Sequence, residues 1–199
     1  MPDLYILAGP NGTGKTTYYN TAIEYGFIST TLPFLNADNI CRDELGGYSP
    51  ENATIAEEIV RERIKELIAK EESFMIESNL ALQSDYDWIY IMRIAGYRII
   101  LHFLCTSNVE INIARVQKRI LEGGHPIAEA IIRQRYYNGL MYLKGKLHTF
   151  DEAILLDNSD VTPVKVAVIN NGTLTNKIEN TPAWANDALF IISKLTRDR

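Results

Sequence analysis

A glycine-rich run near the start of the chain has residue types suited to holding phosphate. Residues 9–16 read Gly-Pro-Asn-Gly-Thr-Gly-Lys-Thr and match the spacing G-x-x-x-x-G-K-[ST]. Glycines let backbone N–H groups turn toward phosphate oxygens without a Cβ clash, and Lys15 adds a charge for the β- and γ-phosphates. The Thr16 hydroxyl is suited to bind Mg²⁺. The predicted nucleotide-binding residues are Gly9, Pro10, Asn11, Gly12, Thr13, Gly14, Lys15, Thr16 and Thr17.

The elements around this run fit the same chemistry. Residues 4–8 form a short apolar stretch typical of a buried strand, and residues 17–23 read as the first turns of a helix. The helix N-terminus places a partial positive charge behind the phosphates. A glycine-rich turn that binds nothing is the alternative, and the strand-loop-helix context disfavours it. We therefore expect a site for Mg²⁺ and a nucleoside triphosphate.

Two carboxylates follow predicted strands. Asp38 lies just beyond the strand expected over residues 32–36, and Glu77 ends the apolar run of residues 73–79. In open α/β sheets, ligands bind beyond the carboxyl ends of the strands. A functional Glu77 is favoured over a capping or surface role, because an acid at the end of a buried run is costly without a purpose. For Asp38 the pattern leaves catalysis and helix N-capping equally open.

A basic segment covers residues 115–146. It contains seven lysines and arginines against Glu122 and Glu129, a net charge of +5 in a chain of formal charge −5. Arginine suits phosphate oxygens, although such a run is often a solvated helix face. Helices expected over 108–121 and 127–143 meet at the Gly123-Gly124 corner, so the segment is predicted to form an arginine-rich lid over phosphates.

The order of elements predicts the fold. Strands are expected over residues 4–8, 32–36, 73–79, 98–105 and 153–159, each followed by a helix except the last, which a hairpin (164–169 and 173–178) and a terminal helix (182–194) follow. We predict one α/β domain over 1–199, a P-loop NTPase with a doubly wound, mostly parallel five-stranded sheet and helices on both faces. Residues 160–199 would add a small C-terminal hairpin and helix. His102 and Cys105 lie inside a predicted strand and are expected to be core residues.

Composition excludes several classes of protein. The net negative charge argues against a dedicated nucleic-acid binder. No apolar run reaches the roughly 20 residues that span a bilayer, and the chain enters its first strand without a signal peptide. The two cysteines, Cys41 and Cys105, lack metal-site spacing and are expected to be reduced thiols. These features predict a cytoplasmic protein that does not bind membranes or nucleic acid.

Three classes of P-loop protein remain: a small-molecule kinase, a GTP- or ATP-binding switch without an acceptor, and a motor or transporter ATPase. The switch has two partial motifs, residues 43–46 (D-x-x-G) and residues 176–179 (N-K-x-E), but neither follows a core strand. A transporter would carry an L-S-G-G-Q-like signature, which is absent from the sequence. A kinase uses the P-loop, both strand-end acids and the lid, so we favour it.

These residues resemble the zeta-toxin family of kinases, especially the branch often labelled predicted ABC-type ATPases. The likeness covers the chain from residue 4 to about residue 159. It is carried by the P-loop, by Asn36-Ala37-Asp38, and by residues 115–136, "RVQKRILEGGHPIAEAIIRQRY". Family members often read Glu-Thr-Thr where this chain reads Glu77-Ser78-Asn79, a loop that should help to shape the acceptor pocket.

The resemblance implies roles for individual residues. Asp38 aligns with the catalytic base, while Lys15 and Thr16 carry over as contacts to phosphate and Mg²⁺. Glu77, with Asn79 in the same loop, would face the acceptor. Three arginines fall where lid arginines are found: Arg119, Arg133 and Arg135.

The resemblance also implies substrates and a partner. The chain would transfer the γ-phosphate of ATP to a hydroxyl of a small molecule, such as UDP-N-acetylglucosamine or another nucleotide sugar. A separate small helical antitoxin would be its partner.

Overall fold

We describe the protein from a computed structural model, in which residues 1–122 and 124–195 are described. Gly123 of the predicted corner and residues 196–199 of the predicted C-terminal segment lie outside the described residues.

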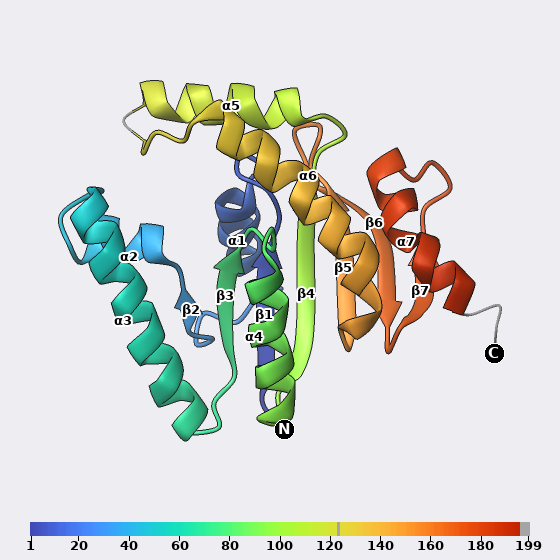
Figure 1. Ribbon diagram of the computed structural model, residues 1–199, viewed down its shortest axis with the longest axis horizontal. Helices are drawn as coiled ribbons and strands as arrows, with labels where there is room; N and C mark the ends of the chain where they lie inside the picture. Colours follow the sequence, from blue (N-terminus) through green and yellow to red (C-terminus); the bar gives the residue numbers. More distant parts are fainter. Residues whose placement is uncertain (123, 196–199) are drawn as a thin grey trace.

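One sheet organises the chain (Figure 1). Its strands are β1 (Asp3–Ala8), β2 (Phe34–Leu35), β3 (Phe74–Ser78), β4 (Arg98–Cys105), β5 (Glu152–Asp157), β6 (Val164–Asn170) and β7 (Thr173–Lys177). Within the described residues their order is β2-β3-β1-β4-β5-β6-β7. The first five pair in parallel, as predicted, so their carboxyl ends all meet at one edge of the sheet.

The C-terminal hairpin is part of the sheet, which differs from our prediction. We expected a five-stranded sheet with a separate small hairpin, but β6 pairs antiparallel with β5 and β7 with β6. The turn between them uses Asn171 and Gly172, both with positive φ (48° and 70°), as the Asn-Gly signal predicts. Val166 and Ile169 on β6 are almost fully buried. The hairpin therefore extends the sheet and covers the edge that β5 would otherwise expose.

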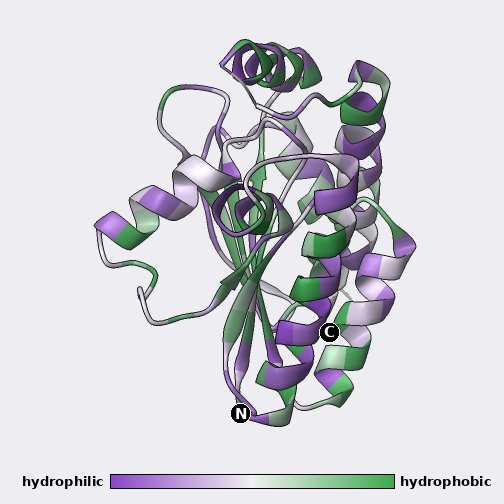
Figure 2. Cartoon of the chain, turned by 90° about the vertical axis from the view of Figure 1, so that its left-hand side faces the viewer, coloured by the Kyte–Doolittle hydropathy of each residue, from purple (hydrophilic) through white to green (hydrophobic). Residues whose placement is uncertain are grey.

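Helices cover both faces of the sheet. They are α1 (Lys15–Glu24), α2 (Ala37–Asp43), α3 (Pro50–Ala69), α4 (Gln83–Ile94), α5 (Val109–Leu121), α6 (Glu129–Lys146) and α7 (Ala183–Leu195), with a short 3₁₀ turn at Leu147–Thr149. Alternate residues of β1 divide between the faces: Leu4 and Ile6 join the core under α4, α6 and α7, whereas Leu7 packs with α1. Figure 2 shows the strands as a largely hydrophobic centre, surrounded by helices of mixed character.

Two further parts of the fold position the site. Helices α2 and α3, which we call the arm, lie beside the β2 edge of the sheet and share a small buried cluster of Ile40, Cys41 and Ala56 (Figure 1). Helix α5 lies across the carboxyl ends of the strands, and α6 descends from there over one face (Figure 1). The arm and these two helices therefore surround the edge at which ligands bind in parallel α/β sheets.

The hairpin's contribution to stability can be measured. Ile169 is fully buried in β6, so Ile169→Ala should lower the free energy of unfolding by about 2–5 kcal/mol in denaturant titrations. Val164→Ala on the same strand is the control, because Val164 is 50% exposed and its truncation should cost less than about 0.5 kcal/mol. Equal, small effects of both changes would mean that the hairpin is not part of the core.

Candidate functional site

The P-loop, residues 9–16, is held in shape by close packing of its glycines. Gly9, Gly12 and Gly14 have φ values of 137°, 80° and 86°, in the region that favours glycine. A Cβ on Gly9 would lie 2.0 Å from the carbonyl oxygen of Leu104 on β4. A Cβ on Gly12 would lie 2.4 Å from the carbonyl oxygen of Asn112 on α5. The loop is therefore built against its neighbours, and only glycine fits at these positions.

Two asparagines outside the P-loop hold its backbone. Asn112 Nδ2 donates to the Asn11 carbonyl oxygen at 2.7 Å, and Asn158 Nδ2 donates to the Thr13 carbonyl oxygen at 2.6 Å. Both side chains are buried. We had not predicted either role for them; a polar residue on the apolar face of α5 was the signal for Asn112. These bonds satisfy carbonyl groups that the turn leaves without helix or sheet partners.

Lys15 is buried and folded back onto the P-loop. Its Nζ donates to the carbonyl oxygens of Gly9 at 2.7 Å and Pro10 at 3.3 Å, and it lies 3.5 Å from Glu77 Oε1. Burial lowers the pKa of the Lys15 ammonium, while the Glu77 carboxylate opposes this effect. A charge held by carbonyl oxygens and one carboxylate can exchange these partners for phosphate oxygens without losing compensation.

Helix α1 begins at the end of the P-loop and is held by a side-chain contact with β4. Thr16 and Thr17 in its first turn are exposed, whereas the Tyr18 hydroxyl lies 3.0 Å from Nδ1 of His102 on β4. Burial lowers the pKa of His102 to about 4, so the ring is neutral at pH 7. This agrees with the predicted core role of His102. The neutral ring supports α1 rather than holding a ligand.

Asp38 does not cap α2, so one of the two roles that the sequence allows for it is excluded. Asn36 is the N-cap of α2, since its Oδ1 accepts from the Asn39 backbone N–H at 3.1 Å. Asp38 lies in the first turn of the helix and is exposed. Its carboxylate faces the P-loop side of the arm, where it adds to the charges that favour the ammonium form of Lys15.

Glu77 connects the P-loop to the arm. It is the second-to-last residue of β3, and its Oε2 accepts from Asn36 Nδ2 at 2.6 Å while Oε1 faces Lys15. Its side chain is 21% exposed, so it is accessible from the space beyond the strand ends.

Two cavities open at this edge of the sheet. The P-loop cavity, about 830 Å³, lies between the P-loop, α1, the arginines of α5 and the segment 158–163 that follows β5. The arm cavity, about 730 Å³, lies between the arm, the end of β3, the segment 125–128 and α6. Among the described residues, Asn11, Asp38 and Glu77 line both cavities. The two spaces therefore meet at the predicted base and the strand-end glutamate.

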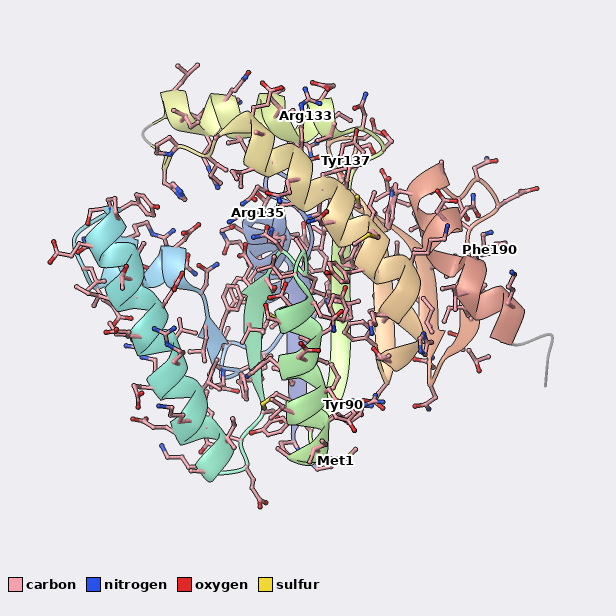
Figure 3. The ribbon with its side chains drawn as sticks, in the orientation of Figure 1. Met1, Tyr90, Arg133, Arg135, Tyr137 and Phe190 are labelled. Carbon is pink, nitrogen blue, oxygen red and sulfur yellow. The ribbon has the colours of Figure 1, made fainter. Side chains whose placement is uncertain are left out.

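The predicted lid arginines have different surroundings. Arg119 lines the P-loop cavity, and Arg135 lines the arm cavity while its Nη1 donates to Asn11 Oδ1 at 2.9 Å. Arg133 instead forms ion pairs with Glu110 and Glu129, both at 2.6 Å. Figure 3 shows Arg135 near the tip of β3 and Arg133 at the outer side, beside α5. The fold thus brings Arg119 and Arg135, but not Arg133, to the two cavities.

A fourth arginine was only part of the predicted basic segment. Arg115 Nη1 donates to the Asn158 carbonyl oxygen at 2.7 Å, and its Nη2 donates to that of Asp160 at 3.0 Å. Arg115 also lines the P-loop cavity. It fixes α5 to the segment that follows β5.

Two residues that line the arm cavity each have a buried polar atom without a protein partner in the described part of the chain. Asn79 Oδ1 and His125 Nδ1 are buried and have no hydrogen-bond partner among the described residues. The His125 ring stacks on Tyr48 with centroids 3.8 Å apart, which joins the segment before α6 to the arm.

The donor set fits a magnesium ion that is held mainly by a nucleotide. Thr16 supplies an exposed hydroxyl in the P-loop cavity. Among the described residues, no group of three or more His, Cys, Asp or Glu side chains is arranged to hold a metal ion. Mg²⁺ keeps several waters and binds through few protein ligands plus phosphates, so a single hydroxyl is consistent with it.

Sequence comparison gives limited information. No family model matches the chain. An uncharacterized protein of Haemophilus influenzae is 27% identical over 135 residues, which cover 64% of this chain and 88% of that protein. In the described part of the chain, no helix is both long and apolar enough to cross a bilayer.

Comparison of structures shows the fold. A chain of the AvrRxo1-ORF1:-ORF2 complex crystallised with ATP is similar at a TM-score of 0.67 and 16% identity, over 94% of this chain and 64% of that chain. This protein therefore spans about 64% of the length of that chain. A chain of the PezAT chromosomal toxin-antitoxin system of Streptococcus pneumoniae is similar at a TM-score of 0.61 and 16% identity, over 100% of this chain and 87% of that chain. At this identity the likeness shows the fold alone, and the predicted α/β fold with a mostly parallel sheet and helices on both faces is confirmed.

The neutral His102 makes stability depend on pH. Because its pKa is lower in the folded protein than in the unfolded chain, the stabilisation is fully present above about pH 6.5 and is lost as the pH falls toward 4. Between pH 6.5 and pH 4 the free energy of unfolding should fall with decreasing pH. We expect His102→Gln to make this fall smaller by about 1–3 kcal/mol. His148→Gln, at an exposed histidine, is the control. A slope unchanged by His102→Gln would contradict the neutral assignment.

Proposed function

We propose that this chain is an ATP-dependent kinase that transfers the γ-phosphate to a hydroxyl of a small-molecule acceptor. The observation that carries the proposal is the meeting of two cavities at Asn11, Asp38 and Glu77. A nucleotide in the P-loop cavity would present its last phosphate to a carboxylate that also faces the arm cavity. A protein that only binds or hydrolyses a nucleotide has no need of a second cavity of about 730 Å³ at this point.

The P-loop would bind the phosphates. Its backbone N–H groups and the N-terminus of α1 supply partial positive charge, and Lys15 would leave the Gly9 carbonyl oxygen for the β- and γ-phosphates. Thr16 would hold Mg²⁺, which would supply charge stabilisation to the phosphates. Residues 9–17 together form the proposed nucleotide site.

Transfer would be direct. The acceptor oxygen forms a bond to the γ-phosphorus as the bond to the β–γ bridging oxygen breaks, and ADP leaves. Asp38 would accept the proton of the acceptor hydroxyl. Arg119 and Arg135, which line the two cavities, would offset the charge on the transferring group. Glu77 and Asn79 would orient the acceptor from the end of β3.

Substrates and partners follow by analogy. The AvrRxo1 complex was crystallised with ATP, and PezAT is a toxin-antitoxin system, which supports ATP as the donor and a separate antitoxin as a partner here. The resemblance to zeta toxins makes UDP-N-acetylglucosamine and other nucleotide sugars the first acceptors to assay. A cytoplasmic location, where ATP is available, is part of the same proposal.

A nucleotide switch is less well supported. Asp43 of the D-x-x-G run is the last residue of α2 and is ion-paired with Arg42 at 2.7 Å. Asn176 of the N-K-x-E run is in β7, at the outer edge of the sheet. Neither lies among the residues that line the P-loop cavity. The geometry therefore gives these motifs no part in reading a nucleotide.

Asp38 can be tested by an isosteric change. Asp38→Asn removes the proton acceptor, so kcat should fall about 10²–10⁴-fold while the Kd for ATP stays within about twofold. Phosphorylated product would be followed by mass spectrometry and ATP binding by calorimetry. Lys15→Ala should abolish transfer, whereas Asp43→Asn, an exposed change on the same helix, should have no effect. Near-wild-type turnover of Asp38→Asn would remove Asp38 from the mechanism.

The arginines give a matched pair on one helix. Arg135→Gln should lower kcat about 10³-fold, because its guanidinium lies where the two cavities meet. Arg133→Gln should leave kcat within about twofold, since Arg133 is held at the surface by Glu110 and Glu129. Single-turnover rates under saturating ATP would measure both variants. The reverse ranking would assign the lid role to Arg133.

A further inference from the structure

A ring contact between Tyr48 and His125 joins the two parts of the protein that carry the proposed catalytic groups. Tyr48 lies in the loop between α2 and α3 of the arm, and His125 lies between α5 and α6. The rings are stacked, with centroids 3.8 Å apart and an angle of 10° between their planes. Building on the proposed kinase function, we propose that this stack, which we call the clasp, sets the position of Asp38 relative to Arg119 and Arg135. It makes Tyr48 and His125 positioning residues for phosphoryl transfer.

The clasp bridges the space proposed for the acceptor. Both of its rings line the arm cavity, as do Asp38 and Arg135. In Figure 1 the arm stands to the left of the strand ends, while α5 and α6 lie above them. The stack therefore connects two sides of this cavity. Of the described residues that line the P-loop cavity, neither belongs to the clasp, so the proposed ATP site does not involve it.

On the arm, Tyr48 is tied to the helix that carries Asp38. Asn52 Nδ2, in the first turn of α3, donates to the Gly47 carbonyl oxygen at 2.8 Å. The Gly47 backbone N–H in turn donates to the Cys41 carbonyl oxygen at 2.8 Å, about one turn after Asp38 in α2. Because Tyr48 follows Gly47 directly, a shift of its ring is passed through the backbone to α2 and Asp38.

On the other side, His125 is tied to the proposed lid arginines. The backbone N–H of Gly124 donates to the Arg119 carbonyl oxygen at 2.8 Å, and a Cβ on Gly124 would lie only 2.6 Å from Arg119 Cγ. Helix α6 begins at Glu129, and Arg135 lies in its second turn. His125 is therefore placed between the two arginines on a short segment of the chain.

The clasp is held by ring contact rather than by charge. Burial lowers the pKa of His125, against the opposing effect of Asp38. Arg119 and Arg135 lower this pKa further, so the ring is neutral at pH 7. Among the described residues, no hydrogen bond or ion pair joins the arm to α5, to α6 or to the segment between them. No polar contact between these parts therefore substitutes for the stack.

Phosphoryl transfer is sensitive to positioning of this kind. Asp38 on the arm would take the proton of the acceptor, while Arg135 lies where the two cavities meet, with its Nη1 donating to Asn11 Oδ1 at 2.9 Å. A displacement of about 1 Å between reacting groups can cost about 10²-fold in rate. Loss of either ring leaves each group on its own element but releases the distance between the two elements. The clasp therefore acts on kcat and leaves ATP binding unchanged.

Kinetics separates positioning from direct contact with the acceptor. Tyr48→Ala should lower kcat about 10–100-fold, while the KM for the acceptor and the Kd for ATP stay within about threefold. Tyr48→Phe keeps the ring and should retain kcat within about twofold. Transfer from Mg·ATP to UDP-N-acetylglucosamine and other nucleotide sugars by the full chain would be followed by mass spectrometry. A rise in KM at unchanged kcat would make Tyr48 an acceptor contact and overturn the inference.

The two rings should behave as one unit. His125→Ala should match Tyr48→Ala, and the double variant should lose no more activity than either single variant. Tyr90→Ala is the matched control, because Tyr90 is 65% exposed on α4 and lines neither cavity in the described part of the chain (Figure 3). Tyr48 is 46% exposed, so its removal should shift the unfolding temperature by no more than about 3 °C. Additive losses in the double variant would contradict the clasp.

Hydrogen exchange tests the clasp without any acceptor. The backbone N–H groups of Gly47 and Gly124 are hydrogen-bonded, each within its own side of the clasp. Tyr48→Ala should raise exchange in peptides that cover residues 124–128 at least about threefold, and His125→Ala should do the same for residues 44–49. Tyr90→Ala should change neither. A rise confined to the mutated side would overturn the inference.

The outcomes separate this inference from the kinase proposal. Transfer that is lost in Lys15→Ala but unchanged in Tyr48→Ala upholds the kinase and overturns the positioning role. If no compound gains phosphate and ATP binding does not depend on Lys15, the proposed function fails and the positioning role falls with it. Reciprocal exchange would in that case still show the clasp itself.

Discussion

The whole site depends on a loop backbone that leaves no room for side chains. The P-loop glycines press against the Leu104 carbonyl of β4, the Asn112 backbone of α5 and the Asn158 side chain beyond β5. These neighbours lie in β4, in α5 and just beyond β5, and the parallel order β1-β4-β5 brings the strand ends together. The phosphate cradle is therefore a property of the sheet as much as of the glycine-rich run.

A short series of polar contacts links the P-loop to the arm cavity. The buried Lys15 ammonium lies against Glu77, and Glu77 accepts from Asn36. Asn36 in turn caps the helix on which Asp38 lies. Each contact compensates a polar group that would be costly to bury alone. The P-loop, the end of β3 and the arm are therefore fixed relative to one another by contacts of Lys15, Glu77 and Asn36.

Much of this arrangement could be predicted because its signals are local. The P-loop spacing, the strand-end acids and the Asn-Gly turn each depend on neighbouring residues and on general rules for parallel sheets. The hairpin joins β5 through the short segment 158–163, which carries no Asn-Gly signal of the kind that marks the turn between β6 and β7. The capping of α2 by Asn36 instead of Asp38 depended on where β2 ends, a boundary one residue from the prediction.

The sequence also could not show which of the lid arginines faces the cavities. Residues 133 and 135 are two positions apart on α6, so they point to nearly opposite sides of the helix and cannot both face one cavity. Which of them faces inward depends on the rotation of α6 against the core, where Ile132, Tyr136 and Leu143 are buried. The asparagines that hold the P-loop were equally hidden, because their partners are more than a hundred residues away in the sequence.

The common wall of the two cavities has a stereochemical consequence for the proposed reaction. Donor and acceptor would occupy separate spaces, so both can be bound at once and neither has to leave before the other enters. The attacking oxygen would approach the phosphorus from the arm side, opposite the departing ADP. A single displacement of this kind inverts the configuration at phosphorus and passes through a ternary complex rather than a phosphorylated enzyme.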